Sequence, residues 1–144
     1  MLLVALMLAQ TVPQCPATDV NLPAPLAAWT APGDGLSPGK AMWLRAGDPA
    51  KLAWPVANPK PGKASVIAFR VDTPGTYGVA LDKGGWIDLY PIKGKTPLKS
   101  VRHGHGPECS SIRKIVWFDL KPATYRLTVT GLQADTVKAM LVRE

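Results

Sequence analysis

The sequence predicts an all-β protein, an antiparallel β-sandwich or jelly roll of eight or nine short strands with a proline-rich N-terminal arm. From residue 40 onward, short apolar or alternating runs recur at roughly ten-residue spacing and are separated by turn residues. No stretch keeps a helical period of apolar residues over three turns. Prolines crowd the first part of the chain, where they forbid a long helix.

Residues 1–10 are the first segment, which we expect to be a secretory signal peptide. They are apolar from Met1 to Ala9 and lead into a flank that contains the helix breaker Pro13. The run is too short to span a bilayer. No Lys or Arg precedes it, and the small-residue pattern before a cleavage site is poor, so a buried N-terminal strand is the alternative. We expect a periplasmic or secreted protein without a transmembrane span in the mature chain.

Cys15 and Cys109 are the two cysteines of the chain. In an oxidising compartment, such a pair forms a disulfide more often than it stays as two free thiols. A bridge between these cysteines would close a loop made of most of the chain. In the chain-entropy model, such a bridge stabilises a protein by about 2 to 5 kcal/mol. The alternative is a cytosolic protein with two buried, unpaired cysteines.

Residues 11–39 form a Pro/Ala-rich arm, and residues 40–144 form the predicted sandwich domain. At the start of the domain, residues 41–45 and 51–54 are short and apolar enough to be strands. Three tryptophans in this part are expected to cover one end of the core, namely Trp29, Trp43 and Trp54.

The strands that follow become more regular. In 65–71, apolar Ile67, Phe69 and Val71 alternate with Arg70, which predicts one buried and one exposed face. Turns at Pro-Gly, Gly-Gly and Pro-Ala steps separate the later strands. We expect the later strands at 76–81, 86–90, 98–102, 113–120, 125–130 and 137–142. The run 98–102 is the weakest of them, and the mixed pattern of 113–120 is typical of a central strand.

The chain is basic, with a net charge of +7 and a pI of about 9.7. In a cytosolic protein this charge would favour a nucleic-acid partner. The basic residues between 93 and 114, however, form a loose group with neither an aromatic platform nor a helix for a groove. We therefore expect no nucleic acid as partner, but anionic envelope components or another envelope protein. The alternative is a solvated surface rich in lysine, and the oligomeric state stays open.

Two segments share a pattern of strand, turn and a second strand that begins with tyrosine. They are 69–81, which turns at Pro74-Gly75, and 118–129, which turns at Pro122. The pair resembles the two units of bacterial pre-peptidase C-terminal β-sandwich domains, except that Ala123 stands where the family has glycine. This resemblance covers about residues 40–144 and implies a secreted jelly-roll accessory domain without an activity of its own.

The chain is also similar to small exported proteins of sphingomonad-like bacteria. It shares with them Trp86-Ile87-Asp88 and the segment from His103 to Cys109. Some of those proteins carry an automatic homogentisate dioxygenase name. The resemblance thus implies an enzymatic alternative, a non-haem iron dioxygenase.

That alternative depends on His103, His105 and Glu108, because non-haem iron oxygenases hold iron with two histidines and a carboxylate. On an extended strand, a His-x-His pair places both imidazoles on one side. The glutamate is one residue closer than in cupins, and the chain has no third histidine. Copper or zinc, held by the same histidines with Glu108 or a reduced Cys109, is the milder alternative.

The structural interpretation is that this segment is a clasp, that is, a loop that fastens the N-terminal arm to the domain. Gly104 and Gly106 allow tight turns, Pro107 stiffens the loop, and a bridged Cys109 would anchor it to the arm. A bridged cysteine cannot act as a nucleophile, and the serines that follow lack a nucleophile elbow. We therefore expect no catalytic residue and no cofactor.

The predicted function is an exported, disulfide-stabilised, non-catalytic module of the cell envelope with a binding or structural role. The first alternative is the metal-binding or iron-dependent protein described above. The second is a glycan-binding module, in which Trp86 or Tyr90 would stack on a pyranose ring.

Overall fold

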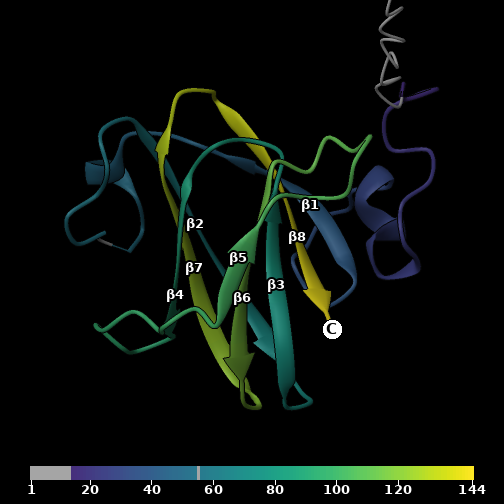
Figure 1. Cartoon of the computed structure of the whole chain (residues 1–144). Coiled ribbons are helices and arrows are strands. Elements are labelled where there is room, and N and C mark those ends of the chain that lie inside the picture. Colours follow the sequence, from purple (N-terminus) through teal and green to yellow (C-terminus); the bar gives the residue numbers. More distant parts are fainter. Residues whose placement is uncertain (1–13, 55) are drawn as a thin grey trace, which may run out of the picture.

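The computed structural model describes residues 14–54 and 56–144, and it is a sandwich of two antiparallel sheets (Figure 1). One sheet has five strands in the order β1-β8-β3-β6-β5, and the other has three in the order β2-β7-β4. The strands are β1 (Lys40–Arg45), β2 (Lys63–Val71), β3 (Gly75–Leu81), β4 (Trp86–Pro91), β5 (Arg102–Gly104), β6 (Lys114–Leu120), β7 (Ala123–Leu132) and β8 (Thr136–Arg143). The predicted fold class, an all-β sandwich of eight or nine strands, is confirmed.

The main core lies between the two sheets and follows from the alternation of side chains along each strand. Leu89 of β4 and Leu127 and Val129 of β7 are fully buried from the three-stranded side. Val79 of β3 and Phe118 of β6 meet them from the five-stranded side. Burial of each such side chain stabilises the fold by about 1.5 to 3 kcal/mol.

Two turns carry the chain from one sheet to the other, and both are closed by a tyrosine. The Tyr77 hydroxyl donates to the Thr73 carbonyl over 2.6 Å, and the Tyr125 hydroxyl donates to the Lys121 carbonyl over 2.8 Å. Each tyrosine thus bonds the residue four positions before it. The ring of Tyr125 also stacks on Phe69, with centroids 5.8 Å apart. The shared strand-turn-tyrosine pattern is therefore a shared corner between sheets.

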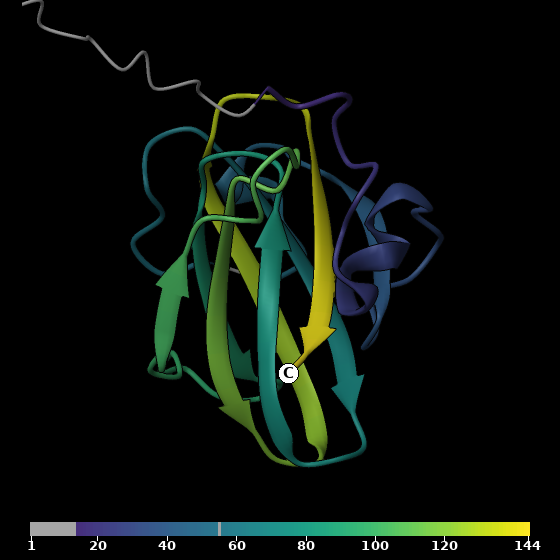
Figure 2. The same cartoon turned by 45° about the vertical axis from the view of Figure 1, so that its right-hand side comes forward.

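The arm covers the outer face of the five-stranded sheet, where Figure 2 shows its short 3-10 helix η1 (Ala24–Thr30) beside the sheet. Pro23 and Pro25 begin this helix, because proline has the backbone angle that a first helical turn needs. Leu26 and Trp29 are buried there in a second apolar cluster. The sheet contributes Ala41, Ala80, Ile115, Met140 and Val142 to that cluster, and the loop before β6 contributes Ile112. The part of the five-stranded sheet that lies beneath the arm is thus covered on both faces.

Three local expectations are wrong. Residues 51–54 do not form a strand, because Pro49 and the Asp48 side chain, which accepts from the Ala50 amide, begin the 3-10 helix η2 (Pro49–Lys51) there. The strand expected at 98–102 is instead β5, which starts only at Arg102.

The third concerns the tryptophans, which do not cover one end of the core together. Trp29 is fully buried beneath the arm, whereas Trp43 is 47% exposed and Trp54 is 37% exposed.

The predicted signal peptide, residues 1–10, lies outside the described residues. Within the part that the structure describes, no helix has the length and apolar character needed to cross a membrane.

Candidate functional site

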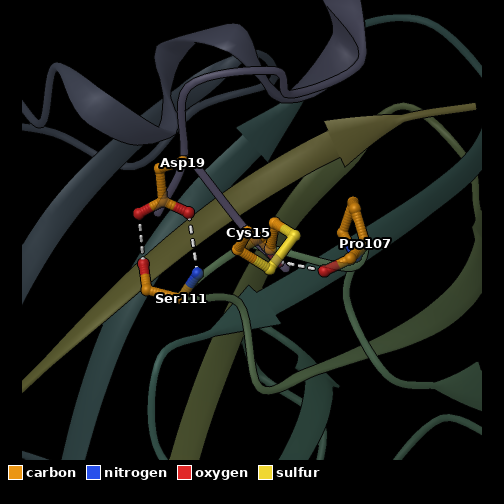
Figure 3. The surroundings of a disulfide bond; sticks show 6 residues. Cys15, Asp19, Pro107 and Ser111 are labelled. Carbon is orange, nitrogen blue, oxygen red and sulfur yellow. Dashed lines mark hydrogen bonds between the residues drawn. A yellow bond between two sulfur atoms is a disulfide. The ribbon is translucent and has the colours of Figure 1, made fainter. Parts of the chain in front are cut away.

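The segment with the scarce reactive residues is tied to the arm by a disulfide between Cys15 and Cys109 (Figure 3). The two Cα atoms are 5.3 Å apart, and 94 positions separate the residues in sequence. The predicted cysteine pairing is confirmed. The sulfur of Cys109 is therefore bonded and is not free to act as a nucleophile or metal ligand.

Hydrogen bonds around Asp19 extend this clasp. The Asp19 amide donates to the Cys109 carbonyl over 2.8 Å, and its carboxylate accepts from the amide and the hydroxyl of Ser111 over 2.7 and 2.5 Å. Figure 3 shows Asp19 facing Ser111 beside the disulfide. The indole N–H of the buried Trp29 also donates to the Ser111 hydroxyl, over 2.9 Å. Ser111 thus joins the arm, the loop and the second apolar cluster.

The structure does not assemble a metal site from His103, His105 and Glu108. All three residues are exposed, and His103 lies on the edge strand β5, opposite Val116 of β6. Among residues 14–54 and 56–144, no group of three or more His, Cys, Asp or Glu side chains lies close enough together to hold a metal ion. The observed contacts of the loop are those of the clasp.

A different part of the molecule has the features of a ligand site. An open pocket of about 410 Å³ lies over the outer face of the three-stranded sheet. Three groups of side chains line it, from β4 and β7, from the segment after η2, and from the loop after β4. They are Tyr90, Arg126 and Thr128; Trp54, Val56 and Ala57; and Lys93, Gly94 and Lys95. In Figure 1 this side of the molecule lies opposite the arm.

Strand alternation places the pocket residues on the outer face. In β4, Ile87 and Leu89 point into the core, so Asp88 and Tyr90 point outward. In β7, Tyr125, Leu127 and Val129 belong to the core, so Arg126 and Thr128 between them point outward. The register pairs Tyr90 with Arg126 and Asp88 with Thr128. Three pocket residues and Asp88 beside them thus form two cross-strand pairs on the outer face.

The guanidinium of Arg126 is held in one position by the loop after β4. It donates to the Ile92 carbonyl over 3.1 Å and to the Gly94 carbonyl over 3.2 Å. Its Cζ lies 4.7 Å from the centre of the Tyr90 ring, which is a cation–π distance. Arg126 forms no ion pair within the described residues, so no protein carboxylate neutralises its charge.

Two buried polar atoms of this face have no hydrogen-bond partner among the described residues. They are the Nε of Arg126 and the hydroxyl of Thr128. Leaving such a group unpaired costs about 1 to 3 kcal/mol, so an unpaired group calls for an explanation. Both residues line the pocket, although neither of these two atoms is open to solvent.

The pKa of Tyr90 is raised above its ordinary value of 10.0. Burial is the main cause, the negative charge of Asp88 adds to it, and the positive charge of Arg126 opposes it. The phenol is therefore neutral at physiological pH. Tyr90 is only 8% exposed, so it adds a small uncharged surface to the pocket.

Sequence reasoning missed most of this site. The sequence indicates Tyr90 as a stacking residue, and it shows the lysines near 93 only as a loose basic group. Arg126 and Thr128 had one usable signal, since they are polar on the non-core face of a strand that lies between two others. Comparison with protein-family models, with curated proteins and with solved structures gives no match for this chain.

Proposed function

We propose that this protein is an exported, disulfide-stabilised binding module of the cell envelope, and that its pocket holds an anionic group of an envelope component. The observation that carries the proposal is the composition of the pocket. Its lining combines two aromatic rings, Trp54 and Tyr90, with three cations, Arg126, Lys93 and Lys95, and none of the described residues that line it is a carboxylate. Concave sites with apolar walls and a few convergent polar groups are where proteins bind small ligands.

The positioning of Arg126 supports recognition of a carboxylate or phosphate. Its planar guanidinium matches these groups better than a lysine does. Two backbone carbonyls already fix it, so a ligand does not have to order it on binding. Lys93 is exposed at the rim, as is Lys95, where each can pair with a charge from solution.

Export is supported by the disulfide, since such bonds persist in oxidising compartments. The resemblance to secreted pre-peptidase C-terminal domains fits the same placement. A non-catalytic role fits a site that offers cations and aromatic rings but no nucleophile paired with a base.

Binding is tested by titrating the folded protein with three anionic probes: lipopolysaccharide, phosphatidylglycerol vesicles and oligogalacturonate. We expect at least one of them to bind, and we expect Lys93→Ala/Lys95→Ala to weaken that binding about tenfold at low salt. The matched control is Lys40→Ala/Arg45→Ala, which removes two exposed charges from β1 of the other sheet. Equal losses in both double variants, or no binding of any probe, would contradict the proposed site.

Export has its own test, a fusion of the chain to alkaline phosphatase, an enzyme that is active only outside the reducing cytoplasm. We expect an active fusion. A fusion that stays inactive while the protein accumulates would overturn the proposed location and leave the pocket to be judged by the titrations.

A further inference from the structure

The outer face of β4 carries a second aromatic and cationic position. Trp86 begins this strand and is 59% exposed. The Lys60 ammonium lies 4.5 Å from the centre of its ring, and the Lys114 ammonium lies 5.9 Å from it. A large apolar ring that is open to solvent and flanked by two cations has the same chemistry as the pocket.

Trp86 and the pocket lie along one line of the sheet. Trp86, Asp88 and Tyr90 alternate on the outer face, so Trp86 and Tyr90 are about 13 Å apart at about 3.3 Å per strand residue. A few linked pyranose rings span this length. Asp88 lies between the two aromatic rings, beside the unpaired hydroxyl of Thr128 in the neighbouring strand.

The unpaired atoms indicate what chemistry fits between the rings. Thr128 lines the pocket but is only 2% exposed, and its buried hydroxyl has no partner among the described residues, so a ligand bonds it only after a small shift of the lining. A hydroxyl both donates and accepts, the Arg126 Nε–H donates, and the Asp88 carboxylate accepts. A ligand with several hydroxyl groups meets all three requirements.

We propose, building on the function proposed above, that the ligand is an acidic oligosaccharide of the uronic-acid type that lies along the outer face of β4 from the pocket to Trp86. One sugar ring packs against Trp54, beside the small exposed part of Tyr90, and a later one packs against Trp86. The carboxylates of the sugar pair with the cations of the pocket and with Lys60 and Lys114. Its hydroxyls bond Thr128 and Asp88.

Asp88 distinguishes this ligand from a nucleic acid, the other polyanion that stacks on aromatic rings. A phosphate group at this position would present oxygens that only accept hydrogen bonds to the Asp88 carboxylate, which also only accepts. A sugar presents hydroxyl donors there instead. The concave shape of the pocket, in turn, suits a projecting group better than the flat surface of a membrane.

The experiment measures affinity by calorimetry for digalacturonate, which fills the pocket alone, and hexagalacturonate, which reaches Trp86. We expect Trp86→Ala to weaken the hexamer about tenfold and to leave the dimer within about twofold. Trp43→Ala is the matched control, because Trp43 is also exposed and also has a lysine ammonium over its ring, that of Lys138, at 5.4 Å. It lies on the other sheet and should change neither affinity.

Thr128→Val provides a second variant of nearly equal shape. We expect it to weaken the dimer and the hexamer alike, about tenfold, while the melting temperature stays the same or rises, because the hydroxyl has no partner in the described fold. A fall in melting temperature with unchanged affinity would assign the hydroxyl a structural role and overturn its part in binding.

The outcomes separate the two proposals. If phosphatidylglycerol vesicles, lipopolysaccharide or an oligothymidylate bind through Lys93 and Lys95 more tightly than hexagalacturonate does, the pocket stands and the uronic-acid class is wrong. If hexagalacturonate binds but Trp86→Ala has no more effect than Trp43→Ala, the extended site is wrong. If no anionic probe binds, the proposed function itself fails.

Discussion

Gly106 shows at the scale of one residue why the loop before Cys109 contains two glycines. A Cβ at Gly106 would lie 2.3 Å from the Ile112 carbonyl oxygen and 2.5 Å from the Ile112 Cβ. A Cβ at Gly104 would meet nothing within 4 Å. Only one of the two glycines is therefore required by packing.

Gly106→Ala should destabilise the protein by about 1 to 3 kcal/mol, because the backbone has to move to make room. Gly104→Ala is the matched control and should change the free energy of unfolding by no more than about 0.5 kcal/mol. Urea unfolding of both variants measures the difference. Equal changes in the free energy of unfolding for the two variants would mean that the backbone at Gly106 can move at little cost.

Ser111 is the residue through which the arm and the loop share hydrogen bonds. Ser111→Ala removes the hydroxyl that donates to Asp19 and accepts from the indole of Trp29, which is fully buried. We expect a loss of about 1 to 3 kcal/mol in the free energy of unfolding, since a buried donor is left without a partner.

Ser110→Ala is the neighbouring control for that change, because the Ser110 hydroxyl makes only a local bond to the Pro107 carbonyl. Ser110→Ala should lower the free energy of unfolding clearly less than Ser111→Ala does. A larger loss of unfolding free energy for Ser110→Ala than for Ser111→Ala would mean that Ser110, not Ser111, links the arm to the loop.

Tyr90 makes the stability of the folded protein depend on pH in the alkaline range. Its folded pKa is raised, chiefly by burial, so its contribution to stability is complete below the unfolded value of 10.0 and is lost as the pH rises through the folded value. Titration of tyrosinate absorbance should show a late-titrating phenol among the three tyrosines. Tyr90→Phe should lack that late step, and its persistence would assign the raised pKa to another tyrosine.

At the scale of the elements, the clasp converts an arm with little regular structure into a cover for the five-stranded sheet. The disulfide, the Asp19 contacts and the burial of Leu26 and Trp29 act on one segment. Their effects are therefore coupled, and loss of the bridge weakens the other contacts as well.

The double variant Cys15→Ser/Cys109→Ser should lower the free energy of unfolding by about 2 to 5 kcal/mol. The chain-entropy model attributes most of this to the freed unfolded chain, because the bridge closes a long loop. Thermal unfolding of the oxidised protein with and without reductant measures the same quantity. An unchanged melting temperature after full reduction would mean that the bridge does not stabilise the native state.

Most strands were predictable from the sequence because their side chains alternate between a buried and an exposed face. Phe69 and Val71 of β2 are buried and Arg70 is exposed, as the pattern predicted. The errors lie where alternation was absent. Leu52 to Trp54 are apolar enough for a strand, but Pro49 starts a helical turn just before them, and the partly exposed Trp54 lines a pocket.

At the scale of the whole molecule, the two sheets have different roles. The arm covers the outer face of the five-stranded sheet, and the pocket lies on the outer face of the three-stranded sheet. The core between them separates the stabilising clasp from the proposed binding face.

This separation predicts that stability and binding vary independently. Below its melting temperature, the Cys15→Ser/Cys109→Ser variant should bind hexagalacturonate within about twofold of the native protein, because distant sites without shared partners do not couple. Calorimetry at a temperature where the variant is folded by circular dichroism is the measurement. A loss of affinity in the folded variant would show that the arm contributes to the pocket.

The sequence by itself determined the all-β class, the tyrosine-containing strand pairs and the cysteine pairing, because alternation and scarce cysteines are local or countable properties. Only the tertiary structure decided which residues meet. It left His103, His105 and Glu108 on an exposed clasp, and it joined Tyr90, Arg126 and Thr128 with Trp54 across three segments. The physical reason is that a site between strands depends on strand order and register, and those are set by packing over the whole core.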